Sequence, residues 1–285
     1  MIGLAPAAGY VLLGVGVGIF GTLVGAGGGF VLTPVLLLLF PYDPPAAITA
    51  TSLAVVFANA ASGSVSYFRM HRADYRSGII LAVATIPGSV LGVLVDSRLP
   101  RHAFNLIMGA ALVLLAVFLI VKPEGRLSLG SGAPVTVESH LKDSEGVEYR
   151  YRFNLALATL FSVGVGFVSS LLGIGGGIIH VPLLTSFFAF PAHVATATSH
   201  FVLMIMAGVG TGTHLVRGDF QDPALVLRTI LLAVGVTVGA PIGARLSQRI
   251  QGRLIIRLLA AALGVVGLRL LLAAVVRSVA GFAFA

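Results

Sequence analysis

The sequence predicts an all-α integral membrane protein with two inverted repeats, each a broken, re-entrant helical hairpin followed by three transmembrane helices. Three observations predict this fold: an apolar composition, apolar stretches of membrane-spanning length, and a glycine-rich segment that occurs twice. We also expect a short cytoplasmic β-hairpin between the halves. The predicted parts are a first membrane repeat, a cytoplasmic connection and a second membrane repeat, at residues 1–121, 122–152 and 153–285.

The composition excludes a water-soluble globule. Of the 285 residues, 57% are hydrophobic and only 10% are charged, and the mean hydropathy is +1.04. This leaves too little polar surface for a soluble domain, so that lipid must solvate the chain. We therefore expect a multi-pass protein of the inner or plasma membrane, with the lipid bilayer as a partner.

Apolar stretches of spanning length recur along the chain. A hydrocarbon core of ~30 Å needs about 20 helical residues at ~1.5 Å per residue. Six stretches meet this length, at 46–67, 78–96, 103–121, 194–216, 226–244 and 258–276. The segment from Ala5 to Val24 is also long enough. Because no Lys or Arg precedes it and no polar cleavage region follows it, we assign it to the mature fold and not to a signal peptide.

The formal net charge of +8 does not indicate a nucleic-acid partner. The arginines stand singly at helix ends, which is typical of topology signals, instead of forming one basic stripe. The chain has no Cys, which excludes disulfides, thiolate chemistry and Cys-based metal sites. We expect no cofactor and no metal, and the sequence leaves a homo-oligomer open.

Two long segments of the chain repeat each other. GVGVGIFGTLVGAGGGFVLTP at 14–34 matches SVGVGFVSSLLGIGGGIIHVP at 162–182 without a gap, and PPAAITATS at 44–52 is echoed by PAHVATATS at 191–199. Two charged residues farther on in the first half have counterparts in the second, namely Arg72 and Asp74 with Arg217 and Asp219. A duplication explains these matches better than chance.

The distribution of basic residues predicts that the halves are inserted upside down relative to each other. The early loop of the first half carries three arginines and its later loop two, whereas the second half has two and then four. The central connection, with five basic residues, falls inside on the same scheme. We expect both termini and the 40–46 and 217–222 connections outside, and 69–76, 122–152 and 245–253 inside.

The segments around the glycines predict helical hairpins that do not cross the membrane. An inverted repeat needs an odd number of crossings per half. Each half already has three clear spans, so residues 5–40 and 153–190 must each add an even number. Since Phe30 to Phe40 would reach only ~16 Å as a helix, we expect a hairpin broken at the glycines that returns to the side it entered from.

The central connection alternates apolar and polar residues. VTVESHL at 135–141 and VEYRYRF at 147–153 flank a Lys142–Gly146 turn, which predicts a small β-hairpin. It could act as a lid or as a connector, and we favour the connector.

The two glycine clusters are the candidate anion site. GAGGG at 25–29 and GIGGG at 173–177 each precede a short helix, whose free N–H groups and positive dipole end suit an anion. Two such helix starts could converge on one anion near the membrane midplane. The alternative is close packing, as we expect for the GxxxG pairs Gly88/Gly92 and Gly239/Gly243. The predicted binding residues here are Gly27, Gly28, Gly29, Gly175, Gly176 and Gly177.

The acidic residues favour an anionic or neutral substrate. All ten fall in loops or at helix ends. A carrier of Na⁺ or metal cations, or a metal-dependent intramembrane hydrolase, would place carboxylates inside the bundle.

The predicted site also includes polar residues inside the spans. They are Thr51, Ser52, Asn59, Thr198, Ser199 and His200. Thr and Ser in helices often bond only their own preceding carbonyls, but their recurrence at matching places in both halves favours a function. His180 and His200 are the candidates for proton coupling, because both could approach the glycines and titrate near neutral pH. The alternative for each is a hydrogen-bonded contact between helices.

The segments GAGGGFVLTP and GIGGGIIHVPLL, the ITATS and ATATS segments after them and the basic turn HRAD resemble the sulfite exporter TauE/SafE family of anion permeases. The likeness spans nearly the whole chain and is most specific from Gly173 to His200. It implies an inner-membrane carrier of sulfite, sulfonates or related sulfur-containing anions, driven by a proton or ion gradient. Leu32 stands where the second half has His180, so any histidine role would be asymmetric.

We therefore expect a secondary transporter of a small anionic substrate, working by alternating access, and no enzymatic activity. An intramembrane enzyme acting on lipid phosphates is an alternative, but it would need an intramembrane acid, base or nucleophile. A passive anion channel is a further alternative that sequence does not separate. Neither glycine cluster is followed by Lys and Ser/Thr, so no ATP-binding P-loop is present.

Overall fold

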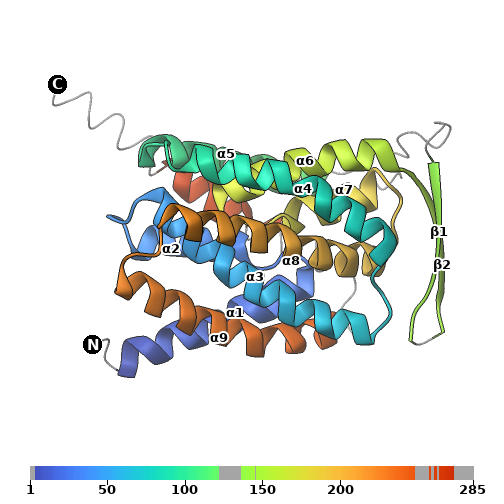
Figure 1. Cartoon of the computed structure of the whole chain (residues 1–285), viewed down its shortest axis with the longest axis horizontal. Coiled ribbons are helices and arrows are strands. Elements are labelled where there is room, and N and C mark those ends of the chain that lie inside the picture. The colour runs from blue at the N-terminus through green and yellow to red at the C-terminus, as the bar shows by residue number, and fades with distance from the viewer. Residues whose placement is uncertain are drawn as a thin grey trace.

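The computed structural model describes residues 4–121, 136–144, 146–247, 257, 260–261 and 263–272. This part of the chain is almost entirely helical and contains one two-stranded sheet (Figure 1). The expected span at 258–276 lies partly outside the described residues, and within it Leu263–Leu272 form a helix.

Seven of the described helices are long and apolar enough to cross a membrane. They are α1 (Leu4–Val24), α3 (Pro45–Arg69), α4 (Tyr75–Asp96), α5 (Arg101–Val121), α6 (Leu155–Leu172), α8 (Ala192–Arg217) and α9 (Pro223–Leu246). The five expected spans between residues 46 and 244 are all confirmed as helices, and the segment from Ala5 to Val24 forms nearly all of α1. The chain is a multi-pass helical membrane protein.

Two short helices follow the glycine clusters. These are α2 (Gly29–Leu39) and α7 (Gly177–Ser186), of 11 and 10 residues. Each would extend only about half of a ~30 Å hydrocarbon core. The limbs of each broken unit are unequal, because α1 and α6 are themselves of spanning length. Both halves therefore share one order: a long helix, a glycine break, a short helix and two further long helices.

Two helix pairs join the halves through glycines. α1 lies along α9, and α4 lies along α6 (Figure 1). A Cβ at Gly88 would lie 2.7 Å from the backbone nitrogen of Phe167, and one at Gly239 would lie 3.0 Å from that of Ile19. Side chains cannot occupy such short separations, so glycine is what permits these backbones to touch. The packing role predicted for the two GxxxG pairs is confirmed.

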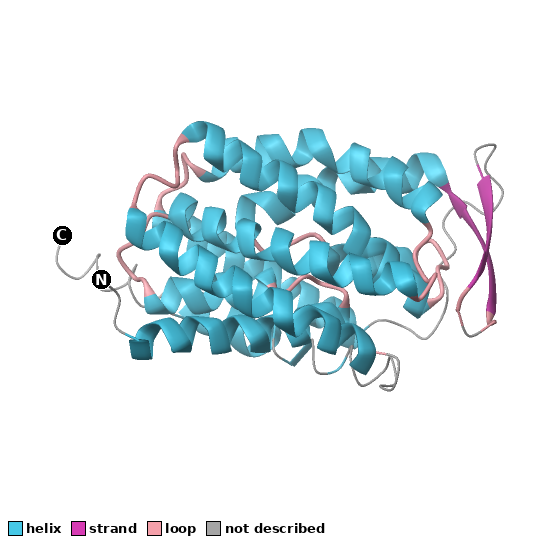
Figure 2. Cartoon of the chain, turned by 60° about the horizontal axis from the view of Figure 1, so that its bottom comes forward, coloured by secondary structure: helices cyan, strands magenta, loops and turns pink. Residues whose placement is uncertain are grey.

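The connections gather at two ends of the bundle. Arg228 Nη2 donates to the Asp43 carboxylate at 2.8 Å, and Arg217 Nη1 donates to the Val93 carbonyl at 2.8 Å. These bonds place the 40–44 and 218–222 connections and the last turn of α4 at one end. The opposite end, called here the hairpin end, carries the 70–74 connection and the sheet (Figures 1 and 2).

The sheet is the predicted β-hairpin. Its strands β1 (Thr136–Lys142) and β2 (Glu148–Asn154) pair antiparallel, with Ser139 opposite Tyr151. β2 begins and ends one residue later than the alternation predicts, and β1 ends one residue later. Figure 2 shows the hairpin standing at one end of the helices.

Buried polar contacts attach the hairpin to the 70–74 connection. The Asp74 carboxylate accepts hydrogen bonds from Ser139 Oγ and Tyr151 Oη, both at 2.7 Å. Arg72 Nε lies 3.2 Å from Asp143 Oδ2, and both of these side chains are buried. Asp74 also accepts from the backbone nitrogen of Ser77 at 3.1 Å and so caps the start of α4. One carboxylate thus links the hairpin to a membrane helix.

The electrostatics of Asp74 follow from these bonds. Burial raises the pKa of the Asp74 carboxyl, but the hydrogen bonds from Ser77, Tyr151 and Ser139 outweigh it. The pKa of Asp74 therefore lies below its ordinary value, and the residue is an anion at neutral pH.

Candidate functional site

The two glycine clusters meet in the interior of the bundle. A Cβ at Gly27 would contact Leu203 and Val56, and a Cβ at Gly175 would contact the same two residues. Val56 and Leu203 are fully buried or nearly so, on α3 and α8. Both breaks therefore contact the same buried pair.

The clusters also touch each other directly. A Cβ at Gly29 would lie 2.6 Å from the Ile174 carbonyl oxygen, and one at Gly177 would lie 2.6 Å from Ala26 Cα. Both separations are too short for any side chain, so glycine at these two positions lets one backbone rest on the other. Close packing, the alternative weighed for the glycines, thus accounts for Gly29 and Gly177.

Left-handed backbone breaks each helix. The φ angles of Gly25, Gly27 and Gly28 are 76°, 74° and 81°, and those of Gly173 and Gly175 are 64° and 75°. An L-residue in this region costs roughly 1–2 kcal/mol. The second break differs at Gly176, whose φ of −64° is helical.

Some amides of the clusters are already bonded and others are free. Gly27 N–H donates to the Gly21 carbonyl at 3.0 Å and is not available to a ligand. Within the described residues, Gly28, Gly29, Gly176 and Gly177 have no hydrogen-bond acceptor for their N–H groups. Free amides at the start of a helix are the groups that bind anions.

Two hydroxyl groups from the first half donate hydrogen bonds to the backbone of the second break. Ser52 Oγ donates to the Gly173 carbonyl at 2.6 Å, and Thr33 Oγ1 donates to the same oxygen at 2.7 Å. Sequence reasoning named Ser52 but missed Thr33, whose counterpart in the second half is Val181. Ser199, the counterpart of Ser52, has a buried Oγ with no protein partner.

A second polar cluster surrounds His200, which is fully buried. Its Nε2 lies 3.4 Å from Thr22 Oγ1, and Thr22 donates to Asn59 Oδ1 at 3.1 Å. The ring packs edge-on against Tyr67, with centroids 5.6 Å apart. Asn59 and His200, both predicted site residues, are thus brought together, and Thr22 was missed.

Two polar atoms of this cluster make no hydrogen bond of normal geometry. They are Nδ2 of Asn59 and Nδ1 of His200, and both are buried. A buried polar group without a hydrogen bond costs about 1–3 kcal/mol. Such atoms are candidates for contact with water or a bound ligand. Because α1 joins Thr22 to the first break three residues later, this cluster and the glycines form one continuous candidate site.

His180 lies in a different environment. Its Nε2 is 3.0 Å from Ser162 Oγ, and that hydroxyl donates to the Ala158 carbonyl at 2.8 Å. With the Ser162 proton committed to its own helix, His180 is the donor in a contact between α7 and α6. The structure does not join His180 to the His200 cluster.

Thr51 and Thr198 contact neighbouring helices instead of the glycines. Thr229 Oγ1 donates to Thr51 Oγ1 at 3.2 Å, and Thr198 Oγ1 accepts from the Asp74 backbone nitrogen at 2.9 Å. The first bond ties α3 to the N-terminal part of α9, and the second ties α8 to the residue before α4.

A buried carboxylate was missed by sequence reasoning. Asp96 is the last residue of α4, as expected of an acidic residue at a helix end, yet its side chain is fully buried. Oδ2 accepts a hydrogen bond from Thr49, and Oδ1 has no partner. A Cβ at Gly173 would lie 2.9 Å from Thr49 Cα, so one residue separates this carboxylate from the second break.

These features define a multi-pass helical membrane protein with two broken helices packed against each other inside it. The family model described as sulfite exporter TauE/SafE matches residues 10–270, and the chain belongs to this family.

Curated relatives cover most of the chain. The chain is 31% identical over 214 residues to the probable membrane transporter protein YunE of Bacillus subtilis. This match covers 73% of the chain and 78% of the relative. A probable membrane transporter protein of Methanocaldococcus jannaschii is 27% identical, and the match covers 72% of this chain and 71% of the relative. One of Haemophilus influenzae is 24% identical, covering 79% of each. No solved structure matches the chain.

Proposed function

We propose that the chain is a secondary transporter of small anions, above all sulfite, organosulfonates or related sulfur-containing anions. It works by alternating access around the two glycine clusters in the inner or plasma membrane. The observation that carries the proposal is the meeting of two broken helices whose starting amides are free, beside the buried pair Val56 and Leu203. The family description supports export of a sulfur-containing anion, and the names of the relatives support membrane transport.

Reciprocal contacts support the inverted repeat. A Cβ at Gly25 would lie 3.0 Å from Thr196 Cα, and one at Gly173 would lie 2.9 Å from Thr49 Cα. Thr49 and Thr196 are 147 positions apart, the offset of the repeated segments. Two halves related by a two-fold axis exchange equivalent contacts in this way, and transporters with inverted repeats place their substrate at that axis.

The re-entrant character of the first broken unit is supported by its neighbours. α1 runs parallel to α9, because a Cβ at Gly14 would meet Gly235 and one at Gly18 would meet Val236. α1 and α9 therefore begin at the same end. The connection after α2 lies at that end too, where Asp43 bonds Arg228 of α9.

The donors in the site suit an oxyanion. Free amide N–H groups and the Asn59 Nδ2 group are donors, and each charge-assisted bond to them is worth about 1.5–3 kcal/mol. We take the chain to be a carrier and not an enzyme, with the hairpin end facing the cytoplasm.

The test is uptake into proteoliposomes from a panel of sulfite, sulfate, sulfoacetate, taurine and carboxylates, with and without a pH gradient. The proposal expects saturable uptake of at least one sulfur-containing anion that rises with the gradient. Uptake that is the same with and without the pH gradient would favour a passive channel. If none of the sulfur-containing anions is taken up, the proposal is wrong.

A further inference from the structure

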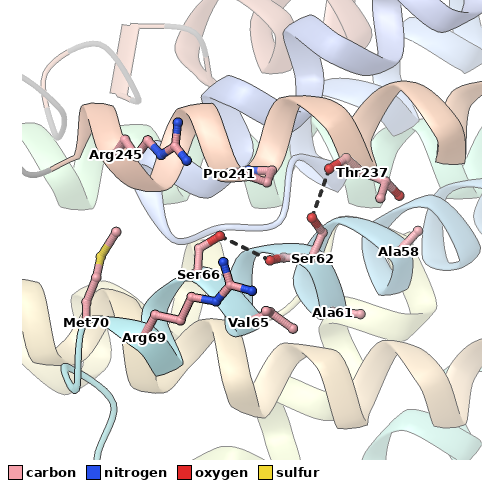
Figure 3. A pocket seen from close by; sticks show the side chains of 10 residues that line it. All are labelled: Ala58, Ala61, Ser62, Val65, Ser66, Arg69, Met70, Thr237, Pro241 and Arg245. Carbon is pink, nitrogen blue, oxygen red and sulfur yellow. Dashed lines mark hydrogen bonds between the residues drawn. The ribbon is translucent and has the colours of Figure 1, made fainter.

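A groove separate from the glycine clusters lies between α3 and α9 at the hairpin end. Its volume is about 730 Å³, and its walls include Ala58, Ala61 and Val65 of α3 and Pro241 of α9 (Figure 3). Ser62 Oγ donates to the Thr237 carbonyl at 2.9 Å and closes the groove between the two helices. The walls of the groove are therefore mixed, with apolar side chains along both helices and the hydroxyl groups of Ser62, Ser66 and Thr237 between them.

Two arginines flank the end of the groove nearest the hairpin. Arg69 is the last residue of α3, and Arg245 lies in the last turn of α9. Figure 3 shows them on the two facing helices that form the walls. Both are exposed, and within the described part of the chain neither forms an ion pair with a carboxylate. Among the described residues, two guanidinium groups thus stand at one end of the groove without a paired carboxylate.

The groove opens toward the surface that faces lipid. Val65, in its wall, is 55% exposed, and Val238 and Ile242 on the neighbouring face of α9 are 57% and 46% exposed. Large apolar side chains exposed on membrane helices contact acyl chains. A ligand in this groove would therefore share the environment of the bilayer and not that of the aqueous phase.

Neither arginine of the groove has an arginine at the equivalent position of the other half. At the 147-residue offset of α3 and α8, Arg69 corresponds to Val216. At the 151-residue offset that relates Gly88 to Gly239, Arg245 corresponds to Leu94. The matching groove of the other half therefore has no guanidinium pair, and the two arginines are a feature of one half only.

We propose that this groove binds an anionic phospholipid, with the headgroup phosphate between Arg69 and Arg245 and an acyl chain along Ala58, Ala61 and Pro241. Guanidinium groups bind phosphate oxygens with paired, charge-assisted hydrogen bonds. Anionic lipids of a membrane surface are attracted to basic residues at helix ends. A small inorganic anion would gain nothing from the apolar walls, so a lipid fits both parts of the groove.

The test is thermal unfolding of the purified protein in detergent, titrated with phosphatidylglycerol, phosphatidylcholine or inorganic phosphate. We expect phosphatidylglycerol alone to stabilise the wild type. Arg69→Gln and Arg245→Gln should each weaken that effect by about tenfold or more in midpoint concentration. Ala61→Leu, which fills the groove without changing charge, should weaken it as well.

Arg76→Gln is the matched control, because Arg76 is also exposed at the hairpin end but does not line the groove. It should leave the midpoint within about threefold of the wild type. An equal loss in Arg76→Gln would show general surface attraction and overturn the proposal. Equal stabilisation by inorganic phosphate would show a free-anion site and overturn it too. Because the readout is lipid binding, the result does not depend on the proposed transport function.

Discussion

His200 packs directly against Gly63: a Cβ at Gly63 would lie 2.5 Å from the Nε2 atom of His200. At the matching place in the other half, a Cβ at Gly210 would lie 2.9 Å from Leu53 Cδ1. The equivalent glycines therefore pack against an imidazole ring in one half and against an aliphatic side chain in the other. A function that uses His200 is asymmetric between two otherwise similar halves.

Gly63→Ala is expected to displace His200 and lower transport. The added methyl would collide with the ring, and overpacking of this kind costs about 1–3 kcal/mol. We expect uptake to fall by roughly tenfold or more and the melting temperature to drop. Gly212→Ala is the control, because a Cβ there meets no atom within 4 Å. Full uptake by Gly63→Ala would show that the position of His200 does not matter.

The two buried histidines are expected to differ. His200 has a ring nitrogen that makes no hydrogen bond of normal geometry, whereas His180 bonds the neighbouring helix through Ser162. His200→Gln should uncouple uptake from the pH gradient and leave substrate exchange intact. His180→Gln should lower folded yield and every transport mode together. Unchanged pH dependence in His200→Gln would remove this histidine from coupling.

The topology can be mapped with single cysteines, because the native chain has none. Ser144, in the hairpin turn, and Gln221, between α8 and α9, are exposed at opposite ends, and Tyr42 is 97% exposed. An impermeant thiol reagent added outside should label cysteine at 42 and 221 but not at 144. Labelling of 144 and 221 from the same side would contradict the inverted repeat.

The bonds from Asp74 to the hairpin are expected to make the stability of the fold depend on pH. Its pKa in the fold is below the ordinary value of 3.8, so its carboxylate stabilises the fold above that value. The contribution is lost as pH falls through the lowered pKa. Asp74→Asn should therefore melt lower at neutral pH and lose less stability than the wild type on acidification below about pH 4. Melting curves identical to the wild type at both pH values would show that the carboxylate contributes nothing.

Much of the fold follows from local sequence patterns. Apolar length predicts the helices, and alternation around Lys142–Gly146 predicts the hairpin, because each depends on residues close in sequence. The unequal limbs of the broken units were less predictable. Hydropathy measures the length of α1 and α6, but only tertiary packing decides how deep in the bundle each glycine break lies.

The site was predictable only in part for a similar reason. The glycines, Ser52, Asn59 and His200 were named as candidates because they repeat or are polar inside apolar spans. Thr22, Thr33 and Asp96 were missed because their partners are remote in sequence; Thr33, for example, bonds the carbonyl of Gly173. Single-residue composition cannot show which face of a helix meets which carbonyl. A hydroxyl inside a broken helix was the available signal for Thr22 and Thr33.

The central claim is that the paired helix starts bind the transported anion, and Gly176 is the position that tests it most directly. Its helical φ tolerates alanine, and an added Cβ would meet only side chains, Met206 at 3.0 Å and Val165 at 3.3 Å. At Gly28, by contrast, the φ of 81° adds strain whatever the function.

The measurement is anion-dependent thermal stabilisation of the purified wild type, Gly176→Ala and Gly28→Ala, titrated with sulfite. An added methyl that keeps the anion from the amide at the start of the helix removes one charge-assisted bond. This should weaken binding by roughly ten- to a hundredfold, so we expect both variants to need correspondingly more anion. If both variants merely melt lower and keep the wild-type shift with sulfite, the glycines are packing residues and the anion binds elsewhere.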